Sequence, residues 1–235
     1  MSPLNEPHAD APTQVVAIDG PSGAGKSTIA RRLAEQLGYR FLDTGAMYRA
    51  ITWLFLERGV LSAEAADGAP AREALAEASL RLQGGRVLLN GEDVTQRLRT
   101  REVEAQVSAV AAMPSVRARM GELQRVVAQQ GPVVAEGRDM CTVVFPRARW
   151  KVYLDAAPAE RARRRCDEFQ QRGRAVAEAQ VLAEILERDR RDSTRADAPL
   201  RRAEDALYVD TTGLAADAVL DRLLGYVRGE DGVEQ

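Results

Sequence analysis

A lysine, three hydroxyl side chains and three glycines lie within nine residues near the start of the chain, at a spacing that can hold a polyphosphate. Residues 20–28 read GPSGAGKST, which matches the pattern G-x-x-x-x-G-K-[ST] in full. Glycine lets backbone N–H groups turn toward an anion, and the helix expected next directs its positive end at the same anion. We expect phosphate contacts along the whole segment, from Gly20, Pro21, Ser22, Gly23, Ala24, Gly25, Lys26, Ser27 and Thr28.

Two side chains of this loop would carry most of its chemistry. Lys26 is expected to reach the β- and γ-phosphates of a nucleoside triphosphate, and the Ser27 hydroxyl is expected to ligate Mg²⁺. The alternative is an ordinary glycine turn before a helix. The apolar run VVAID before the loop favours the phosphate site, because the motif needs a strand there. The motif predicts a site for a triphosphate such as ATP and does not say what the triphosphate is used for.

Polar residues also follow two other apolar runs. FLDTGAMYRA places Thr44 and Gly45 in a turn and Arg49 early in the next helix, while VVAEGRDM places Arg138 and Asp139 at a strand end. Arg138 could bind phosphate. Asp139 could accept a hydrogen bond from an exocyclic amine, such as the N4 amino group that cytosine has and uracil lacks. From these segments alone, a solvated arginine and a turn with a local ion pair stay open as alternatives.

Five short apolar runs predict the strands that would position these residues: Val15–Asp19, Arg40–Asp43, Val133–Glu136, Lys151–Asp155 and Leu207–Asp210. The runs are nearly continuous rather than alternating, as expected for strands buried on both faces. Helices are predicted between them, at Ser27–Leu37, Ala46–Arg58, Val116–Gln130, Ala159–Gln171, Val176–Arg191 and Ala216–Arg228. This alternation predicts an α/β P-loop fold of three layers, in which a five-stranded parallel sheet lies between helices and binds ligands at its carboxyl ends.

One interval is too long for a simple crossover, since about 90 residues separate the second and third strands. Within it, SLRLQGGRVLLNGEDV predicts a small hairpin with Gly84 and Gly85 at its turn. We expect a disordered tail at 1–14, a core domain at 15–59, 113–156 and 190–235, and an inserted lobe of helices plus the hairpin at 60–112. A short helical lid with its adjoining helix is expected at 157–189.

The composition argues against several classes of protein. A net charge of -2 over 235 residues does not suit a protein that coats nucleic acid or an anionic membrane, and no apolar run approaches the roughly 20 residues that span a bilayer. Two cysteines without a recognisable spacing predict neither a disulfide framework nor a zinc site, which fits the cytoplasm. The one histidine lies in a polar, proline-rich N-terminal segment without the apolar centre of a signal peptide, so histidine chemistry is not expected.

Several segments, in this order, resemble the bacterial cytidylate kinase family over about residues 15–228. They are DGPSGAGKST, LDTGAMYRA, NGEDVT with a following RT, EGRDM with TVVFP, KVYLDA with ERARRR, and ERDRRD with a later arginine. Many families share the first segment alone, but the whole ordered set is specific. One departure is Cys141, where relatives usually carry glycine. A need for positive φ at that position would shift Arg138 and Asp139.

The resemblance implies an enzyme that transfers the γ-phosphoryl group of ATP, with Mg²⁺, to CMP or dCMP. It also suggests a monomer. Transfer would be assisted by Lys26, Arg138, Arg188 and Arg195, and the cytosine would be read mainly by Ser108, Arg117 and Asp139. The implied acceptor contacts are Thr44, Tyr48, Arg49, Arg99, Ser108, Arg117, Arg138, Asp139, Arg188, Asp192 and Arg195. The lid would bring Arg161, Arg163, Arg164 and Arg165 to the triphosphate, with Arg161 and Arg165 as ATP contacts.

No catalytic base is apparent, and none is needed, because a phosphate monoester with a second pKa of about 6 is already a nucleophile at neutral pH. The protein would mainly position two anions and stabilise their charge, under lobes that close over both substrates. One alternative is another small-molecule kinase on this scaffold, such as a UMP/CMP kinase. Others are an ATP-dependent regulatory protein that binds a partner and an arginine-rich RNA-binding module, although the net charge of -2 gives the last no support.

Overall fold

A five-stranded parallel sheet forms the centre of the protein, in a computed structural model that describes residues 14–61, 67–171 and 173–229. The strand order is β2-β6-β1-β7-β8. The strands are β1 (Val15–Asp19), β2 (Arg40–Asp43), β6 (Val133–Glu136), β7 (Trp150–Asp155) and β8 (Leu207–Asp210). The predicted parallel sheet is therefore confirmed, with β7 starting one residue earlier than expected. The predicted tail lies outside the described residues, apart from Gln14, whose carbonyl accepts a hydrogen bond from the Val133 N–H at 3.0 Å.

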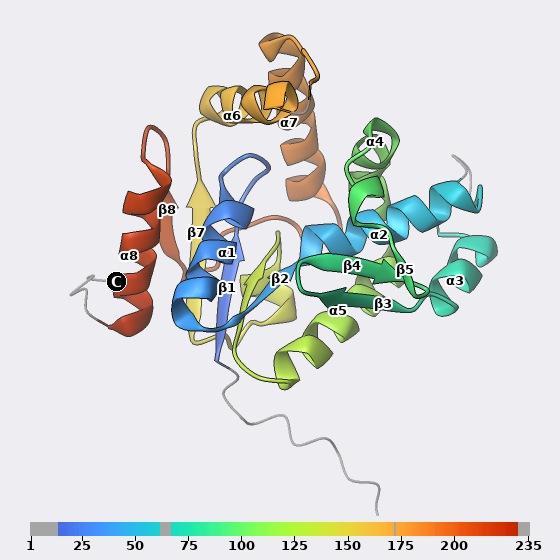
Figure 1. Ribbon diagram of the computed structural model, residues 1–235, viewed down its shortest axis with the longest axis horizontal. Helices are drawn as coiled ribbons and strands as arrows, with labels where there is room; N and C mark the ends of the chain where they lie inside the picture. Colours follow the sequence, from blue (N-terminus) through green and yellow to red (C-terminus); the bar gives the residue numbers. More distant parts are fainter. Residues whose placement is uncertain (1–13, 62–66, 172, 230–235) are drawn as a thin grey trace, which may run out of the picture.

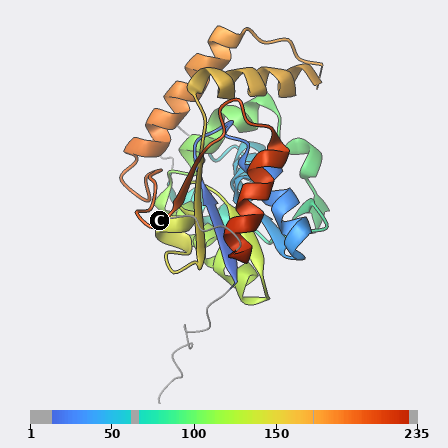
Figure 2. The same cartoon turned by 90° about the vertical axis from the view of Figure 1, so that its left-hand side faces the viewer.

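Helices cover both faces of the sheet, as the three-layer prediction requires (Figures 1 and 2). Helices α1 (Lys26–Leu37) and α8 (Ala216–Arg228) pack on one face, and α2 (Thr44–Glu57) and α5 (Pro114–Gln129) pack on the other. Strand β1 is central, and all five of its residues are fully buried. Val16 and Ile18 face the α1–α8 layer, while Val15 and Ala17 face the α2–α5 layer. A nearly continuous apolar strand is what such two-sided burial demands.

The long interval after β2 holds a second, antiparallel sheet, with strand order β3-β4-β5. Strands β3 (Leu80–Gln83) and β4 (Arg86–Leu89) form the predicted hairpin, and Gly84 and Gly85 turn with φ of 56° and 77°. Both values are left-handed, which explains two glycines at a tight hairpin turn. The prediction did not resolve the other elements here: α3 (Ala69–Ala76), β5 (Glu92–Asp93), η1 (Thr95–Arg97) and α4 (Arg101–Val110). Apolar residues of α3 and α4 join the core cluster that also contains residues of α2 and α5, so the insertion shares a core with the main domain.

Helices α6 (Pro158–Gln171) and α7 (Glu178–Thr194) lie beyond the carboxyl ends of the strands (Figures 1 and 2). They pack on each other through a small apolar cluster that includes Phe169, Val181 and Ile185. Strand β7 leads into α6, and α7 then runs back toward the sheet, so its C-terminal half comes close to α4 and the strand ends. No helix among the described residues is long and apolar enough to cross a membrane.

The start of α2 corrects one detail of the sequence prediction. Thr44 and Gly45 were expected to form a turn before the helix, but they already belong to its first turn. The cause is Asp43, which has an extended backbone and accepts a hydrogen bond from the Ala46 N–H at 2.7 Å, as an N-cap side chain does. The earlier start brings Arg49 one full turn into the helix, where its side chain also lies 3.4 Å from the Asp43 carboxylate.

The crossing of the phosphate-binding segment over β7 makes a stability prediction. Gly20 has φ of +148°, and a Cβ at this position would lie 1.9 Å from the Leu154 carbonyl oxygen. We expect Gly20→Ala to lower the free energy of unfolding by at least about 3 kcal/mol, measured by urea denaturation. Gly38→Ala is the matched control, because Gly38 also has positive φ, +66°, but a Cβ added there would meet no atom within 4 Å. That variant should lose only about 1 kcal/mol; equal losses would contradict the steric explanation.

Candidate active site

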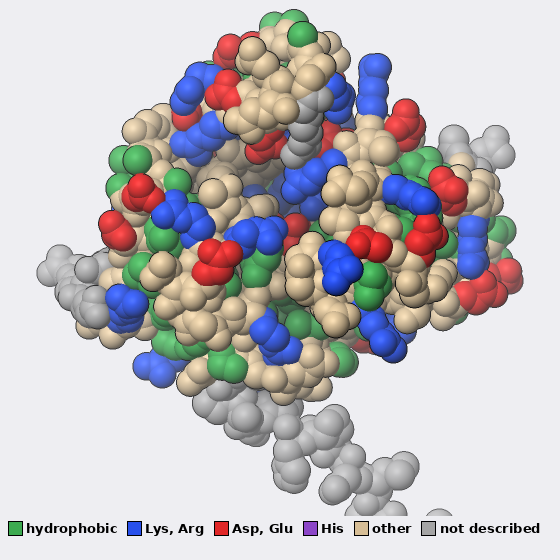
Figure 3. All heavy atoms as spheres, viewed as in Figure 1, with side chains coloured by type: hydrophobic (Ala, Val, Ile, Leu, Met, Phe, Trp, Pro, Cys, Tyr) green, Lys and Arg blue, Asp and Glu red, His purple; other side chains and the backbone are tan. Residues whose placement is uncertain are grey.

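A cavity of about 540 Å³ opens at the carboxyl ends of β1, β2 and β6, under α6 and α7 and beside α4. Figure 3 shows Lys and Arg side chains gathered in the hollow below α6 and α7. The structure brings most of the expected site residues to this cavity. Those that line it are Ser22, Gly23, Gly25, Lys26, Ser27, Thr28, Thr44, Tyr48, Arg49, Arg99, Ser108, Arg117, Arg138, Asp139, Arg165, Arg188, Asp192 and Arg195.

The segment between β1 and α1 forms the wall nearest the first helix. Gly23 and Gly25 have φ of 81° and 86°, which bulkier residues rarely adopt, so glycine is required for this wrapped backbone. Lys26 is 5% exposed, and its ammonium donates to the Pro21 carbonyl at 2.6 Å. Burial and the nearby Arg138 charge lower the pKa of Lys26, so an anion placed here would be stabilised by restoring a full positive charge. Gly20, Pro21 and Ala24 support the loop without lining the cavity.

Glu136, at the end of β6, is a site residue that sequence reasoning did not single out. Its Oε1 accepts a hydrogen bond from the Ser27 hydroxyl at 2.5 Å, and its backbone carbonyl accepts one from the Thr44 hydroxyl at 2.6 Å. Burial raises the pKa of Glu136, and Asp43 raises it further. The available signal was its position, since it ends a buried strand two residues before Arg138. The Ser27 hydroxyl and the Glu136 carboxylate are oxygen donors of the kind that Mg²⁺ prefers.

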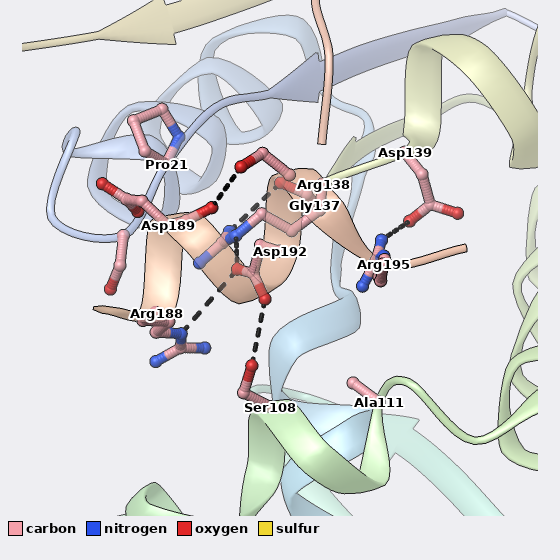
Figure 4. Close-up of polar contacts among 12 residues, drawn as sticks. Pro21, Ser108, Ala111, Gly137, Arg138, Asp139, Arg188, Asp189, Asp192 and Arg195 are labelled. Carbon is pink, nitrogen blue, oxygen red and sulfur yellow. Dashed lines mark hydrogen bonds and ion pairs between the residues drawn. The ribbon is translucent and has the colours of Figure 1, made fainter. Parts of the chain in front are cut away.

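Side chains from three separate elements meet around Asp192 of α7. Arg138 Nε donates to the Asp192 carboxylate at 3.0 Å, Arg188 Nε lies 3.9 Å from it, and the Ser108 hydroxyl donates to it at 3.1 Å (Figure 4). Burial opposes the Asp192 charge, but Arg138 and Arg188 outweigh burial, so the pKa of Asp192 is lowered. Burial and Arg138 together lower the pKa of Arg188 to about 10. One carboxylate therefore holds several cations in place.

Some donors in this cluster have no acceptor among the described residues. The Nε atoms of Arg49 and Arg188 and one terminal nitrogen of Arg195 are buried and without a hydrogen-bond partner there. An unpaired buried guanidinium donor costs free energy that an incoming anion can recover. Phosphate oxygens accept several such hydrogen bonds at once. The cavity is therefore arranged to receive anionic oxygens between α2 and α7.

A second ion-pair cluster lies around Asp139. The Asp139 carboxylate accepts a hydrogen bond from Arg117 of α5, and a terminal nitrogen of Arg195 lies 3.8 Å from its other oxygen (Figure 4). Asp139 is 2% exposed, and burial raises its pKa despite these cations. Tyr48 lies nearby with its pKa raised to about 12 by burial, so its hydroxyl stays protonated at neutral pH. These are hydrogen-bonding groups in a nearly dry wall of the cavity.

The segment that carries Arg138 and Asp139 is anchored from below by Asp19, the last residue of β1. The two Asp19 carboxylate oxygens accept hydrogen bonds from the N–H groups of Met140 at 2.9 Å and Cys141 at 2.7 Å. Cys141 is 2% exposed, lies in the short helical turn η2 (Met140–Val144), and does not have positive φ. The thiol therefore fits without the backbone shift that a positive φ would have caused. The Cys141 thiol donates weakly to the Ala17 carbonyl at 3.4 Å.

The sequence predicts that four arginines of α6 face the triphosphate, but the structure directs only two of them into the cavity. Arg161 was expected to contact the triphosphate, but its side chain is 5% exposed and turns under the loop. It donates to the carbonyls of Ser22 and Ala156 and pairs with Asp189 at 2.5 Å. Arg163 is exposed and pairs with Glu160 on its own helix, since successive residues on a helix face different directions. Of the four arginines expected to face the triphosphate, Arg164 and Arg165 line the cavity.

A phosphate-binding loop after β1, a cation-lined cavity at the carboxyl ends of a parallel sheet and helices on both faces together define a P-loop nucleotide-binding protein. Helix α4 of the insertion and the paired helices α6 and α7 border that cavity. This arrangement places one group of cations beside the loop and another beside Asp139.

The chain belongs to the cytidylate kinase family, whose family model, described as cytidylate kinase, matches residues 16–229. A cytidylate kinase of Carboxydothermus hydrogenoformans is 47% identical over 222 residues, which cover 93% of this chain and 99% of that relative. A bifunctional pantoate ligase/cytidylate kinase of Synechococcus elongatus is 50% identical over 223 residues, 91% of this chain. The match covers 42% of that relative, so the chain spans less than half of its length.

A solved structure of an uncharacterized protein from Eubacterium ventriosum shares the fold, with a TM-score of 0.50 and 12% sequence identity. The match covers 91% of this chain and 98% of that one. Identity this low shows a common fold alone.

The buried Asp19 carboxylate makes a pH prediction. Burial raises its pKa to about 6, against hydrogen bonds from Cys141 and Met140 that lower it. Since the unfolded value is near 3.9, the folded protein binds the proton more tightly. Asp19 then contributes stability that is fully present below about pH 4 and is lost as pH rises through about 6, a change of about 3 kcal/mol. Asp19→Asn should remove this pH dependence.

The measurement is urea denaturation of the original protein and Asp19→Asn at pH 4, 5, 6 and 7. The stability of the original protein relative to the variant should fall by about 3 kcal/mol across this range, because only the original protein titrates at this position. A difference that stays constant from pH 4 to 7 would show that Asp19 does not carry a raised pKa.

Proposed function

We propose that this chain is a nucleoside monophosphate kinase that transfers the γ-phosphoryl group of ATP to CMP or dCMP. The observation that carries the proposal is the single cavity in which the P-loop and the Asp139 cluster face each other across Arg49, Arg138 and Arg188. Family membership over residues 16–229 supports the activity and the base. Arg49, Arg138 and Arg188 lie between the P-loop and the Asp139 cluster, so they would contact both the acceptor phosphate and the donor phosphates.

The transfer would depend on positioning and charge rather than on a catalytic base. The phosphate of CMP is largely a dianion at neutral pH and can attack without losing a proton. Lys26 and the N-terminus of α1 would hold the β- and γ-phosphates, and Arg138 and Arg188 would stabilise charge on the transferring group. The unpaired donors of Arg49 and Arg188 support this role, because phosphate oxygens would give them acceptors.

Mg²⁺ would enter with ATP and offset charge on its phosphates when bound. Ser27 and Glu136 are the residues that would hold it, directly or through water, since their oxygens lie together beside the loop. Arg164 and Arg165 would cover the triphosphate, whereas Arg161 would brace the loop from below through its bond to the Ser22 carbonyl at 3.1 Å. Closure of α6 over bound nucleotide would keep water from acting as the acceptor.

Cytosine would be read at the Asp139 end of the cavity. The N4 amino group of cytosine is a donor, and a buried carboxylate is a strong acceptor for it, whereas uracil would place a carbonyl oxygen against the same carboxylate. Arg117 fixes the Asp139 carboxylate and has donors for the ring, and the Ser108 hydroxyl also lines the cavity. This arrangement supports CMP over UMP as the acceptor.

The direct test is ADP formation from MgATP with CMP, dCMP, UMP, AMP or no acceptor. The proposal expects rapid turnover with CMP and dCMP, weak turnover with UMP and little hydrolysis without an acceptor. Equal turnover with every acceptor would support a kinase but would contradict its selectivity for cytosine. Slow hydrolysis that ignores all acceptors would contradict the kinase and favour an ATP-dependent regulatory protein.

Lys26→Met should lower kcat by about 10²–10³-fold, because a fixed cation beside the transferring group would be lost. The chain offers a matched control, since Lys151 is the only other lysine. Lys151 pairs with Asp205 at 2.6 Å and does not line the cavity. Lys151→Met should therefore leave kcat per folded molecule unchanged, with folding checked by circular dichroism. A Lys26→Met enzyme with full kcat would contradict the role of Lys26.

Asp139→Ala should lower kcat/KM for CMP by about 10–100-fold while leaving kcat/KM for UMP nearly unchanged, because only cytosine loses a charged hydrogen-bond acceptor. Asp197→Ala is the control. Asp197 is the other carboxylate on Arg117, 3.4 Å from its Nε, but it is largely exposed and does not line the cavity. The ratio of CMP to UMP turnover should fall only in Asp139→Ala. An equal loss for both bases would assign Asp139 to folding rather than to reading cytosine.

A further inference from the structure

The two parts that flank the cavity are joined directly by an ion pair. Arg165 of α6 and Glu104 of α4 lie 2.5 Å apart, between the guanidinium Nη2 and the carboxylate Oε1. Their side chains are 18% and 17% exposed, so the pair is largely shielded from solvent. Both residues line the cavity, and they belong to elements separated by 61 positions in the sequence. The pair therefore spans the opening between the inserted lobe and the lid.

Contacts within α6 hold the Arg165 side chain in place on the side that faces α4. Its Nη1 donates to Glu168 at 2.7 Å, and its guanidinium carbon stacks 4.7 Å from the centre of the Phe169 ring. These contacts fix the orientation of the Arg165 guanidinium so that its Nη2 points at α4. Burial opposes the Arg165 charge, but Glu104 outweighs it and the pKa of Arg165 is raised. A long side chain fixed at its base can transmit a displacement of one helix to another.

A second contact crosses the same opening, from the Ser108 hydroxyl of α4 to Asp192 of α7 at 3.1 Å. Ser108 and Asp192 are both expected to contact the acceptor, so an acceptor would compete for that link. Glu104 differs, because it is not one of the expected acceptor contacts. Its partner Arg165 is an expected ATP contact, but a guanidinium has five N–H donors, so Arg165 can hold Glu104 through Nη2 and still donate to a phosphate. The Glu104–Arg165 pair is thus the connection between α4 and α6 that can persist while both nucleotides are bound.

We propose that Glu104 is a positioning residue that couples binding of the acceptor nucleotide to binding of the donor nucleotide. The inference rests on the proposed function, which places the acceptor beside α4 and the triphosphate beside α6. The first nucleotide to bind would order both flanking parts through the pair, so the second would bind to a site that is already ordered. Donor and acceptor would then bind with positive cooperativity, and the cooperativity would depend on Glu104.

The test measures affinities rather than turnover. Calorimetry gives the dissociation constant of a non-hydrolysable ATP analogue with Mg²⁺, with and without saturating CMP, and the ratio is the coupling factor. We expect CMP to tighten analogue binding by about 10-fold in the original protein. In Glu104→Gln the factor should fall to about 2 or less, because the amide cannot form the ion pair. Glu102→Gln is the matched control, with the same charge change at an exposed position on the first turn of α4.

Salt dependence and a double variant distinguish loss of the ion pair from a general loss of structure as the cause of a lower coupling factor. Because the pair is largely shielded from solvent, raising the salt from 0.05 to 0.5 M should lower the coupling factor of the original protein only modestly, and that of Glu104→Gln should not change. Arg165→Gln should reduce the factor as Glu104→Gln does, and the double variant should reduce it no further. A Glu104→Gln protein with the full, salt-sensitive factor would overturn the inference and leave the kinase intact. Failure of the original protein to bind CMP would overturn both.

Discussion

Several positive charges must be held close together, with little water, before any anion reaches the cavity. Lys26, Arg138 and Arg188 lie near one another in the cavity, and the charge of Arg138 helps burial to lower the pKa values of both Lys26 and Arg188. Carboxylates on neighbouring elements offset this repulsion: Glu136 lies beside the loop, and Asp192 lies on α7. Without these carboxylates the cations would repel one another, and holding them close together would cost more free energy. The fold is best understood as the means of bringing these groups together.

The parallel sheet makes this convergence possible. Strands β1 and β6 are neighbours, so the loop after one and the polar segment after the other begin side by side. Asp19 then ties the two together, since it ends β1 and accepts hydrogen bonds from the backbone that follows Asp139. Helix α7 adds Arg188 and Asp192 from the opposite side. The insertion after β2 and the paired helices α6 and α7 complete the walls, and the Glu104–Arg165 pair joins those walls to each other.

The sequence predicted the strands and the phosphate loop closely, because buried parallel strands leave nearly continuous apolar runs and the loop needs glycines at fixed spacing. It also placed Lys26, Arg49 and Arg138 near the carboxyl ends of the strands, where all three line the cavity. It could not reveal that Arg161 turns beneath the loop toward Asp189, because neighbouring arginines on one helix look alike until the packing of α6 on α7 is known. Glu136 and Glu104 were missed because each acts through a partner more than 60 residues away.

The central claim is that one cavity receives a donor and an acceptor nucleotide at the same time, with their phosphates sharing the same cations. A compound that joins adenosine and cytidine through a chain of five phosphates tests this directly by calorimetry. If the cavity is shared, one molecule should bind per chain, at least about 100-fold more tightly than ATP or CMP alone, because the two halves are linked. Binding no tighter than that of ATP alone, or two molecules per chain, would contradict a shared cavity.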